Sequence, residues 1–190
     1  MTILALNKPF QMMSQFSEHP TRATLANVIT QPNVYPAGRL DADSEGLLIL
    51  SNMAEIITAV SSAKKKLPKT YWAQVEGEID SNTLKTLCKG VDLGDFVSRP
   101  CQATLLDTKQ VEEQLWQRTP PIRVRTSIPT SWLAVVLTEG KNRQVRRMTA
   151  KIGFPTLRLV RVQIGMLNLF DLNLNPGESC PISAAMLGLK

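Results

Sequence analysis

Two carboxylates and an arginine stand close together in one short segment, residues 38–50, which reads GRLDADSEGLLIL. Its polar half contains Arg39, Asp41 and Asp43, and its apolar half predicts a buried strand. A rigid strand is a good base from which to position a loop carboxylate for chemistry. Asp41, Asp43 and Glu45 could instead hold a divalent cation, or they could form an ordinary solvated turn, as most charged loops do.

A second segment combines a cation with aromatic rings, in the order Lys69-Thr70-Tyr71-Trp72. Such a group suits the stacking of nucleic-acid bases, which is worth about 1–3 kcal/mol per base. Judged on residue types alone, the more ordinary interpretation is that Tyr71 or Trp72 packs in the core or across strands.

The clearest predicted helix covers residues 142–152 in a third segment, which begins EGKNRQVRRM at residue 139. Val145, Met148 and Ile152 follow one another at helical spacing, so we expect them to form a buried stripe. Gly153 then predicts the end of the helix.

This helix also predicts a basic surface opposite the apolar stripe, with Arg143, Arg146, Arg147 and Lys151 on one face. Residues 141–161 include seven Lys or Arg and no Asp or Glu. A solvated helix face usually mixes charges, so this one favours contact with phosphates. One of its arginines could also pair with a buried carboxylate. The cations that we expect to contact nucleic acid are Arg39, Lys69, Lys141, Arg143, Arg147, Lys151, Arg158 and Arg161.

The segments that must position these groups alternate between strands and helices without a strict βαβ repeat. No glycine-rich phosphate loop is present, so an α+β fold with a mixed or antiparallel sheet is favoured over a doubly wound fold. Residues 105–130 are polar and broken by proline, which indicates a surface excursion that joins two lobes. The predicted strands are 3–7, 46–50, 71–79, 132–137 and 156–164, and the other predicted helices are 24–29, 54–61 and 82–89, the last capped by Ser81.

Composition excludes several classes of protein. The 190 residues, 43% of them hydrophobic, fit one domain or one domain split into two lobes. A single histidine and three cysteines without a CxxC pair exclude a His-rich metal centre and make a disulfide framework improbable. The net charge of +6 favours a polyanionic partner. No apolar run approaches membrane-helix length and no signal-peptide pattern opens the chain, so we expect a cytoplasmic protein.

Taken together, these segments resemble the pseudouridine synthases of the small ribosomal type over nearly the whole chain. NKPF at residues 7–10 is similar to the opening motif of that family. Residues 38–50 resemble its catalytic motif, KTYWAQVEG at residues 69–77 its tyrosine motif, and residues 139–169 its C-terminal motif. RTPPIRVRTSIPTSWL at residues 118–133 is similar to members that act on the large subunit. The opening motif often continues with glycine, where this chain has Gln11.

The resemblance implies an isomerase that converts a uridine of 23S rRNA to pseudouridine. Asp41 stands at the position of the nucleophile, Tyr71 at that of a tyrosine that packs on the flipped base, and Arg146 at that of a basic residue that pairs with the nucleophile. Arg39 is at a position associated with entry into the RNA stack. The implied fold is a single catalytic domain over residues 1–190, with a long mixed sheet in two lobes and a central basic cleft. Many members of the family carry a small RNA-binding module before this domain, and we expect no such separate N-terminal domain here.

An isomerisation consumes no co-reactant, so we expect no cofactor and no metal. The expected partner is 23S rRNA or an assembling large ribosomal subunit, with no membrane, and the expected state is a monomer. One alternative is a non-catalytic rRNA-binding or ribosome-assembly protein that uses the same basic face. Another is a metal-dependent nuclease built on Asp41, Asp43 and Glu45, although a guanidinium from Arg146 beside Asp41 would compete with a cation.

Overall fold

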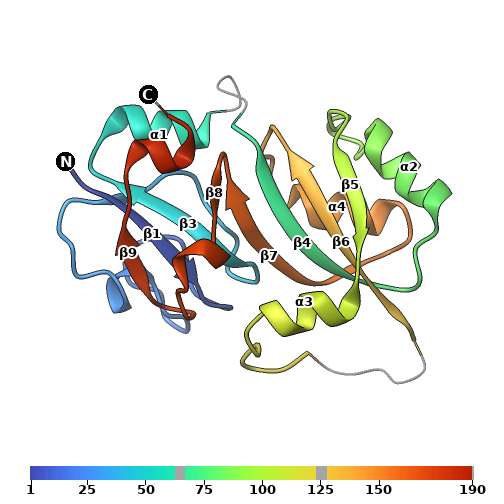
Figure 1. Ribbon diagram of the computed structural model, residues 1–190, viewed down its shortest axis with the longest axis horizontal. Helices are drawn as coiled ribbons and strands as arrows, with labels where there is room; N and C mark the ends of the chain where they lie inside the picture. The colour runs from blue at the N-terminus through green and yellow to red at the C-terminus, as the bar shows by residue number, and fades with distance from the viewer. Residues whose placement is uncertain (63–66, 123–127, 190) are drawn as a thin grey trace. The chain divides into compact units, whose positions relative to one another are not determined.

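The computed structural model describes residues 1–62, 67–122 and 128–189 (Figure 1). By its internal contacts the chain forms two compact units, Met1–Lys69 with Val160–Lys190, and Thr70–Leu159. Residues 105–130, where we expected two lobes to be joined, fall inside the second of these units. The chain passes between the units from Lys69 to Thr70 and from Leu159 to Val160. That one domain contains both units stays a prediction.

The first unit is built on strands that are hydrogen-bonded in the order β7-β3-β1-β9. Every residue of β1 and β3 is buried, as expected for strands with neighbours on both sides. β3 is antiparallel to β1 and parallel to β7, so the sheet is mixed, and helix α1 contacts β3. The elements are β1 (Ile3–Lys8), β2 (Tyr35–Pro36), β3 (Glu45–Ser51), α1 (Ala54–Ser61), β7 (Thr156–Ile164), β8 (Leu167–Asn168) and β9 (Ser179–Pro181).

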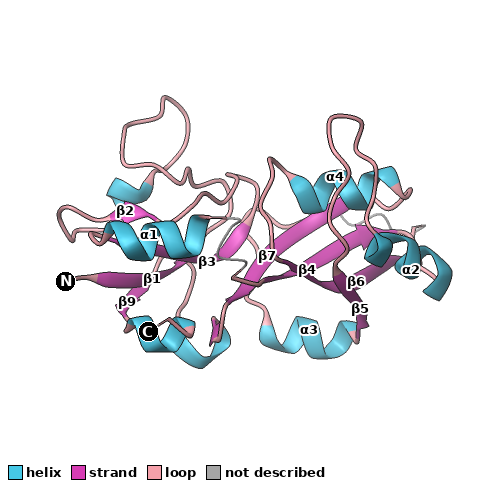
Figure 2. Ribbon diagram, turned by 90° about the horizontal axis from the view of Figure 1, so that it is seen from above, coloured by secondary structure: helices cyan, strands magenta, loops and turns pink. Residues whose placement is uncertain are grey.

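The second unit contains strands in the order β5-β6-β4-β7, because β7 contributes its first residues here and its last residues to the first unit. Helices α3 and α4 lie on opposite faces of these strands (Figure 2). The elements are β4 (Lys69–Glu76), α2 (Ser81–Lys89), β5 (Gln102–Leu106), α3 (Thr108–Gln114), β6 (Thr130–Leu137) and α4 (Gln144–Lys151). The predicted α+β class with a mixed sheet is therefore confirmed.

Most predicted helices form, with informative differences. α1 has the expected bounds. α2 is capped by Asp80, whose carboxylate accepts the N–H groups of Asn82 and Thr83, so Ser81 as the cap was wrong. The expected helix at residues 24–29 is only a single 3-10 turn, Leu25–Asn27. α4 begins two residues later than expected because Arg143 has a left-handed backbone, with φ 49°.

Two elements at the start of the supposed surface excursion and directly before it were not predicted. β5 pairs along its whole length with β6, and α3 contacts β6. α3 buries only Val111, so its sequence lacks a helical apolar repeat, and its start is marked by Asp107, which caps the N–H of Gln110. Residues 123–127, part of the stretch that resembles large-subunit enzymes, lie outside the described residues. Within the described ranges no helix is long and apolar enough to cross a membrane.

Candidate active site

Asp41 lies on a turn of the first unit, between β2 and β3, and is half-buried. Its neighbour Leu40 is buried, and both backbone groups of Leu40 bond to the Ser14 hydroxyl. Leu40 N–H donates to Ser14 Oγ at 3.2 Å, and Ser14 Oγ donates to Leu40 O at 2.7 Å. Ser44 N–H closes the turn by donating to Asp41 O at 3.0 Å. The main chain on both sides of the Asp41 side chain is thus fixed.

The next carbonyl of the turn, Ala42 O, is held by the opening motif. It accepts Gln11 N–H at 2.7 Å and the Lys8 ammonium at 3.5 Å. Gln11 has φ 64°, in the left-handed region that glycine adopts most easily. The departure from glycine at this position therefore keeps the backbone shape that glycine favours, and with it the contact to the Asp41 turn.

Gly46 fixes the exit of the turn into β3. It has φ 99°, and it pairs with Arg161 of β7. A Cβ at Gly46 would lie 2.4 Å from Arg161 O, far inside van der Waals contact. Only glycine lets the two strands approach this closely directly after the Asp41 turn.

Lys8 is the largest side chain among those fully buried in the described residues, and the sequence analysis did not select it. Its Nζ donates to Pro9 O and Met12 O, each at 2.8 Å, besides Ala42 O. Burial lowers the pKa of Lys8 to about 7, although the charge of Glu45 favours the charged amine. The one available signal was a lysine that ends an apolar strand directly before proline.

Two cations of the first unit that we expected to contact RNA are buried. Arg161 is 3% exposed, and its Nε donates to Leu47 O at 2.8 Å. Lys69 donates to Leu67 O at 3.3 Å, and burial, with a smaller effect of Arg161, lowers its pKa to about 8. Arg161 thus joins β7 to β3, and the burial of both side chains argues against phosphate contact.

In the second unit, Tyr71 and Arg158 are also largely covered. Tyr71 is 9% exposed and lies on the buried side of β4, along which buried and half-buried residues alternate. Arg158 donates to Trp116 O at 3.0 Å and lies over the Trp116 ring. The stacking role of Tyr71 stays a prediction, and Arg158 is a poor candidate for phosphate contact.

Helix α4 buries Val145 and Met148 of the predicted apolar stripe, whereas Ile152 follows the helix as its C-cap and is only half-buried. Gly153, with φ 93°, comes next. Arg146 is half-buried, and its Nη1 donates to Thr156 O at 3.2 Å, at the start of β7. The Arg146 guanidinium is thus held at the start of β7 within the second unit, whereas Asp41 belongs to the first unit.

The expectation that α4 carries only uncompensated charge is wrong at Arg147. Asp95, 52 residues earlier in the chain, forms an ion pair with it and accepts two hydrogen bonds from the guanidinium. Lys141 and Arg147 both lie over the ring of Phe96. Of the cations predicted to contact RNA, those that are exposed are Arg39, Lys141, Arg143 and Lys151.

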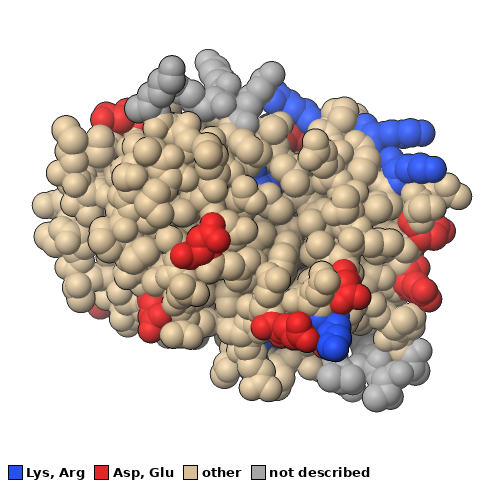
Figure 3. Space-filling model, viewed as in Figure 1, with Lys and Arg blue, Asp and Glu red and all other residues tan. Residues whose placement is uncertain are grey.

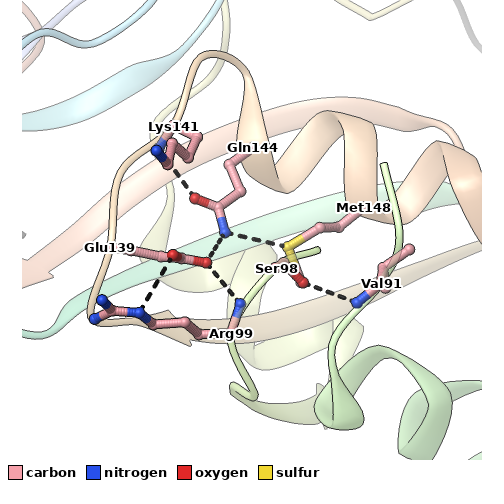
Figure 4. A network of polar contacts seen from close by, with 7 residues as sticks. All are labelled: Val91, Ser98, Arg99, Glu139, Lys141, Gln144 and Met148. Atoms are coloured by element: carbon pink, nitrogen blue, oxygen red, sulfur yellow. Dashed lines mark hydrogen bonds and ion pairs between the residues drawn. The ribbon is translucent and has the colours of Figure 1, made fainter. Parts of the chain in front are cut away.

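A buried polar network fixes the start of α4 (Figure 4). The Glu139 carboxylate accepts Arg99 N–H at 2.8 Å and the Gln144 side-chain amide at 2.6 Å. Gln144 Oε1 in turn accepts Lys141 N–H at 3.0 Å. The network thereby orients the turn that presents Lys141 and Arg143, and sequence reasoning selected neither Glu139 nor Gln144 because each looks like an ordinary polar residue.

Surface charge is distributed unevenly over the second unit. On the face shown in Figure 3, basic side chains gather over α2, which carries Lys85 and Lys89, whereas acidic side chains are scattered.

In the part of the chain that the structure describes, no three His, Cys, Asp or Glu residues are grouped so that they could hold a metal ion. Asp41, Asp43 and Glu45 are therefore not arranged as a cation site.

Comparison with known proteins links this site to a family. A sequence model of the family described as RNA pseudouridylate synthase matches residues 2–151. Ribosomal large subunit pseudouridine synthase E of Vibrio vulnificus is 49% identical over 181 residues, covering 95% of this chain and 75% of that protein. The protein of the same name from Xanthomonas campestris is 49% identical over 178 residues, covering 93% of this chain and 92% of that protein.

The fold comparison agrees with the sequence comparison. A crystal structure of a pseudouridylate synthase superposes with a TM-score of 0.79 at 23% identity, covering 98% of this chain and 72% of that chain. These findings do not support the small ribosomal type that we expected within the family. The match over residues 2–151 and the 49% identity with these two relatives nevertheless establish that this chain belongs to the RNA pseudouridine synthase family.

Proposed function

We propose that the protein converts one uridine of 23S ribosomal RNA to pseudouridine, with Asp41 as the nucleophile. The observation that carries the proposal is the anchored Asp41 turn, whose backbone is bonded to Ser14, Gln11 and Lys8. A carboxylate must be held in a fixed direction to attack one atom of a bound base or sugar. The relatives named large subunit pseudouridine synthase E support ribosomal RNA as the substrate.

The reaction needs no external reagent. The N1–C1′ bond of the uridine breaks, the uracil rotates, a C5–C1′ bond forms, and the proton of C5 is replaced by one on N1. Atoms and electrons balance within the substrate. The chain therefore has to supply an ionised carboxylate, a place for the uracil and a route for one proton.

Tyr71 and Arg146 have the remaining chemical roles in this proposal. Tyr71 packs against the flipped uracil and offsets part of the few kcal/mol that flipping costs. Arg146 stabilises the charged form of Asp41, as a guanidinium does for a neighbouring carboxylate. Arg39, which is exposed, enters the RNA stack where the uridine has left it.

The exposed cations of α4 and its preceding turn contribute the electrostatic part of RNA binding. Lys141, Arg143 and Lys151 contact phosphates, whose position does not depend on base sequence. A ribosomal RNA substrate places the reaction in the cytoplasm. The predictions of a monomer, and of free rRNA or an assembling subunit as the substrate, stay predictions.

The experiment maps pseudouridine in unmodified 23S rRNA after incubation with the purified protein and a chelator. Three proteins are compared: the parent, Asp41→Asn and Asp43→Asn. Asp43 lies two residues from Asp41 on the same turn, so its variant removes the same charge without removing the proposed nucleophile. We expect one new pseudouridine with the parent and with Asp43→Asn, and none with Asp41→Asn.

Other outcomes would point to other functions. Equal RNA binding by all three proteins without any modification would favour the non-catalytic RNA-binding alternative. Strand cleavage that depends on an added divalent ion would indicate a nuclease. Modification by the Asp41→Asn variant at the parent's rate would show that another residue is the nucleophile.

A further inference from the structure

A tight hairpin of the second unit, residues 92–97 between α2 and β5, reaches the basic helix α4; we call it the Asp95 hairpin. Leu93 N–H donates to Phe96 O at 2.9 Å, and a β-bridge joins Asp92 to Val97. Gly94 turns the chain with φ 91°, and its N–H is capped by the Asp92 carboxylate at 2.9 Å. Asp95 and Phe96 are thereby presented at the tip of a defined structure.

The base of the hairpin is fastened to the start of α4. Val91 N–H donates to Ser98 Oγ at 2.8 Å, and Ser98 N–H donates back to Val91 O at 2.9 Å (Figure 4). The next N–H, of Arg99, donates to the buried Glu139 carboxylate, which also binds Gln144 of α4. The hairpin tip is therefore held close to the side chains of α4.

At the tip, Asp95 engages both terminal nitrogens of Arg147. Nη1 donates to one carboxylate oxygen at 3.1 Å, and Nη2 donates to the other oxygen and also to Leu93 O at 3.1 Å. The Phe96 ring lies under the same guanidinium, 5.3 Å from centroid to Cζ. The ion pair holds the pKa of Asp95 below its ordinary value and raises that of Arg147.

This geometry is the one in which a guanidinium binds phosphate. A planar fork that donates two parallel hydrogen bonds recognises carboxylate and phosphate alike. Arg143 and Lys151, one turn before and one turn after Arg147 on α4, are exposed. A polyanion that follows these two cations meets Arg147 between them, where Asp95 already occupies the fork.

We propose that Asp95 is a specificity-determining residue, an internal competitor that occupies the phosphate-binding fork of Arg147 until RNA displaces it. The inference rests on the proposed function, because it takes RNA as the ligand. The Asp95 side chain is 62% exposed, and an exposed ion pair exchanges readily for another anion. Because a tethered competitor acts at a high effective concentration, it weakens binding of arbitrary RNA more than binding of a substrate that many other contacts hold in register.

The test measures binding of a 12-nucleotide oligouridylate to the whole chain over a series of salt concentrations. The variants are Asp95→Asn, Arg147→Gln and the double variant, with Glu112→Gln as the control. Glu112 is an exposed acid on α3, on the opposite face of the strands from α4, so its variant changes the net charge equally. Thermal unfolding of each variant confirms that it is folded.

We expect Asp95→Asn to bind the oligonucleotide roughly 3- to 10-fold more tightly than Glu112→Gln does, with a salt slope steeper by about 0.7, the value for one added phosphate contact on a single strand. Arg147→Gln alone should bind only somewhat more weakly than the parent, because the fork was already occupied and the change leaves the exposed Asp95 carboxylate uncompensated. The double variant, which removes the whole ion pair, should bind like the parent, since the gain from Asp95→Asn requires the released arginine.

Three results would overturn the proposal. They are equal affinities of Asp95→Asn and Glu112→Gln, a gain that persists in the double variant, and a full loss of one phosphate contact in Arg147→Gln alone.

Pseudouridine formation by the parent is measured in parallel on 23S rRNA. If the parent modifies the RNA and Asp95→Asn shows no gain, the competitor fails while the proposed function stands. If the parent modifies nothing, the proposed function fails, and the binding series still decides the role of Asp95.

Discussion

At the scale of single residues, Lys8 shows how a side chain outside the reaction can determine the site. Its ammonium bonds to carbonyls of the opening motif and of the Asp41 turn, so it joins the two segments. Burial of an amine is unfavourable to its charged form. The contact that holds the Asp41 turn is therefore also one that depends on pH.

The first prediction concerns the pH dependence of folding. The folded chain releases the Lys8 proton near pH 7, whereas the unfolded chain retains it to its ordinary value of 10.5. Between these values the unfolded state binds more protons, so Lys8 makes the free energy of unfolding rise with pH; below pH 7 it adds no pH dependence. In Lys8→Met this rise should disappear. The free energy of unfolding of the parent minus that of the variant should therefore increase by about 1.4 kcal/mol per pH unit between pH 7.5 and 9.5.

Urea unfolding at several pH values gives this difference directly. Lys109→Met, which replaces an exposed lysine of α3, serves as the control and should follow the parent at every pH. Lys69 is present in all three proteins, so its own contribution cancels. A constant gap between the parent and Lys8→Met across the range would refute the assignment.

At the scale of elements, α4 begins without the side-chain cap that usually stabilises the first turn of a helix. Arg143, at its N-cap, provides no side-chain cap and has a left-handed backbone. The network of Glu139 and Gln144 closes the preceding turn instead. Glu139 lies 40 residues from Arg99, whose N–H it accepts at the base of the Asp95 hairpin, and it thus orients the helix that carries Arg146.

The second prediction is the cost of removing this network. Glu139→Ala leaves the Arg99 N–H and the Gln144 amide without their buried acceptor, and each such loss costs about 1–3 kcal/mol. We expect the free energy of unfolding to fall by about 2–4 kcal/mol in denaturant titrations. Glu139→Gln keeps an acceptor oxygen and should lose clearly less; equal losses in the two variants would show that the ion pair with Arg99, and not the acceptor, stabilises the turn.

At the scale of the whole molecule, the net charge of +6 does not describe the surface that RNA would meet. Arg161, Lys69 and Arg158 are buried, and Arg147 is compensated. The cations that can act at long range are fewer than the sequence suggests. The salt dependence of RNA binding should therefore be smaller than a count of Lys and Arg in residues 141–161 implies.

The third prediction tests this smaller set. Lys151→Gln, at the exposed end of α4, should reduce the slope of log affinity against log salt by about 0.7 on single-stranded RNA, equally for every base sequence. Lys109→Gln, on the opposite face of the strands, should leave the slope of the parent unchanged. The same loss in both variants would mean that binding follows total charge rather than this face of the molecule.

The sequence alone determined the features that repeat at short range. The spacing of apolar residues predicted β1, β3, β4, β6 and β7 and three of the helices, because the face that a residue occupies follows from its distance to its neighbours along the chain. The run of specific residues around Asp41 also indicated the family, because residues 38–50 are consecutive in the sequence and can be recognised without the fold.

Only the tertiary structure decided which charges are buried and which are paired. Asp95 pairs with Arg147, which lies 52 residues later in the chain. Gly46 and Arg161 are neighbours on the adjacent strands β3 and β7. Arg161 also donates to the Leu47 carbonyl, 114 residues earlier. Long-range contacts of this kind leave no periodic signal, since nothing in the local spacing of Arg147 or Arg161 differs from that of an exposed arginine. The burial of Lys8 is of the same kind, because it follows from the approach of the Asp41 turn to the end of β1.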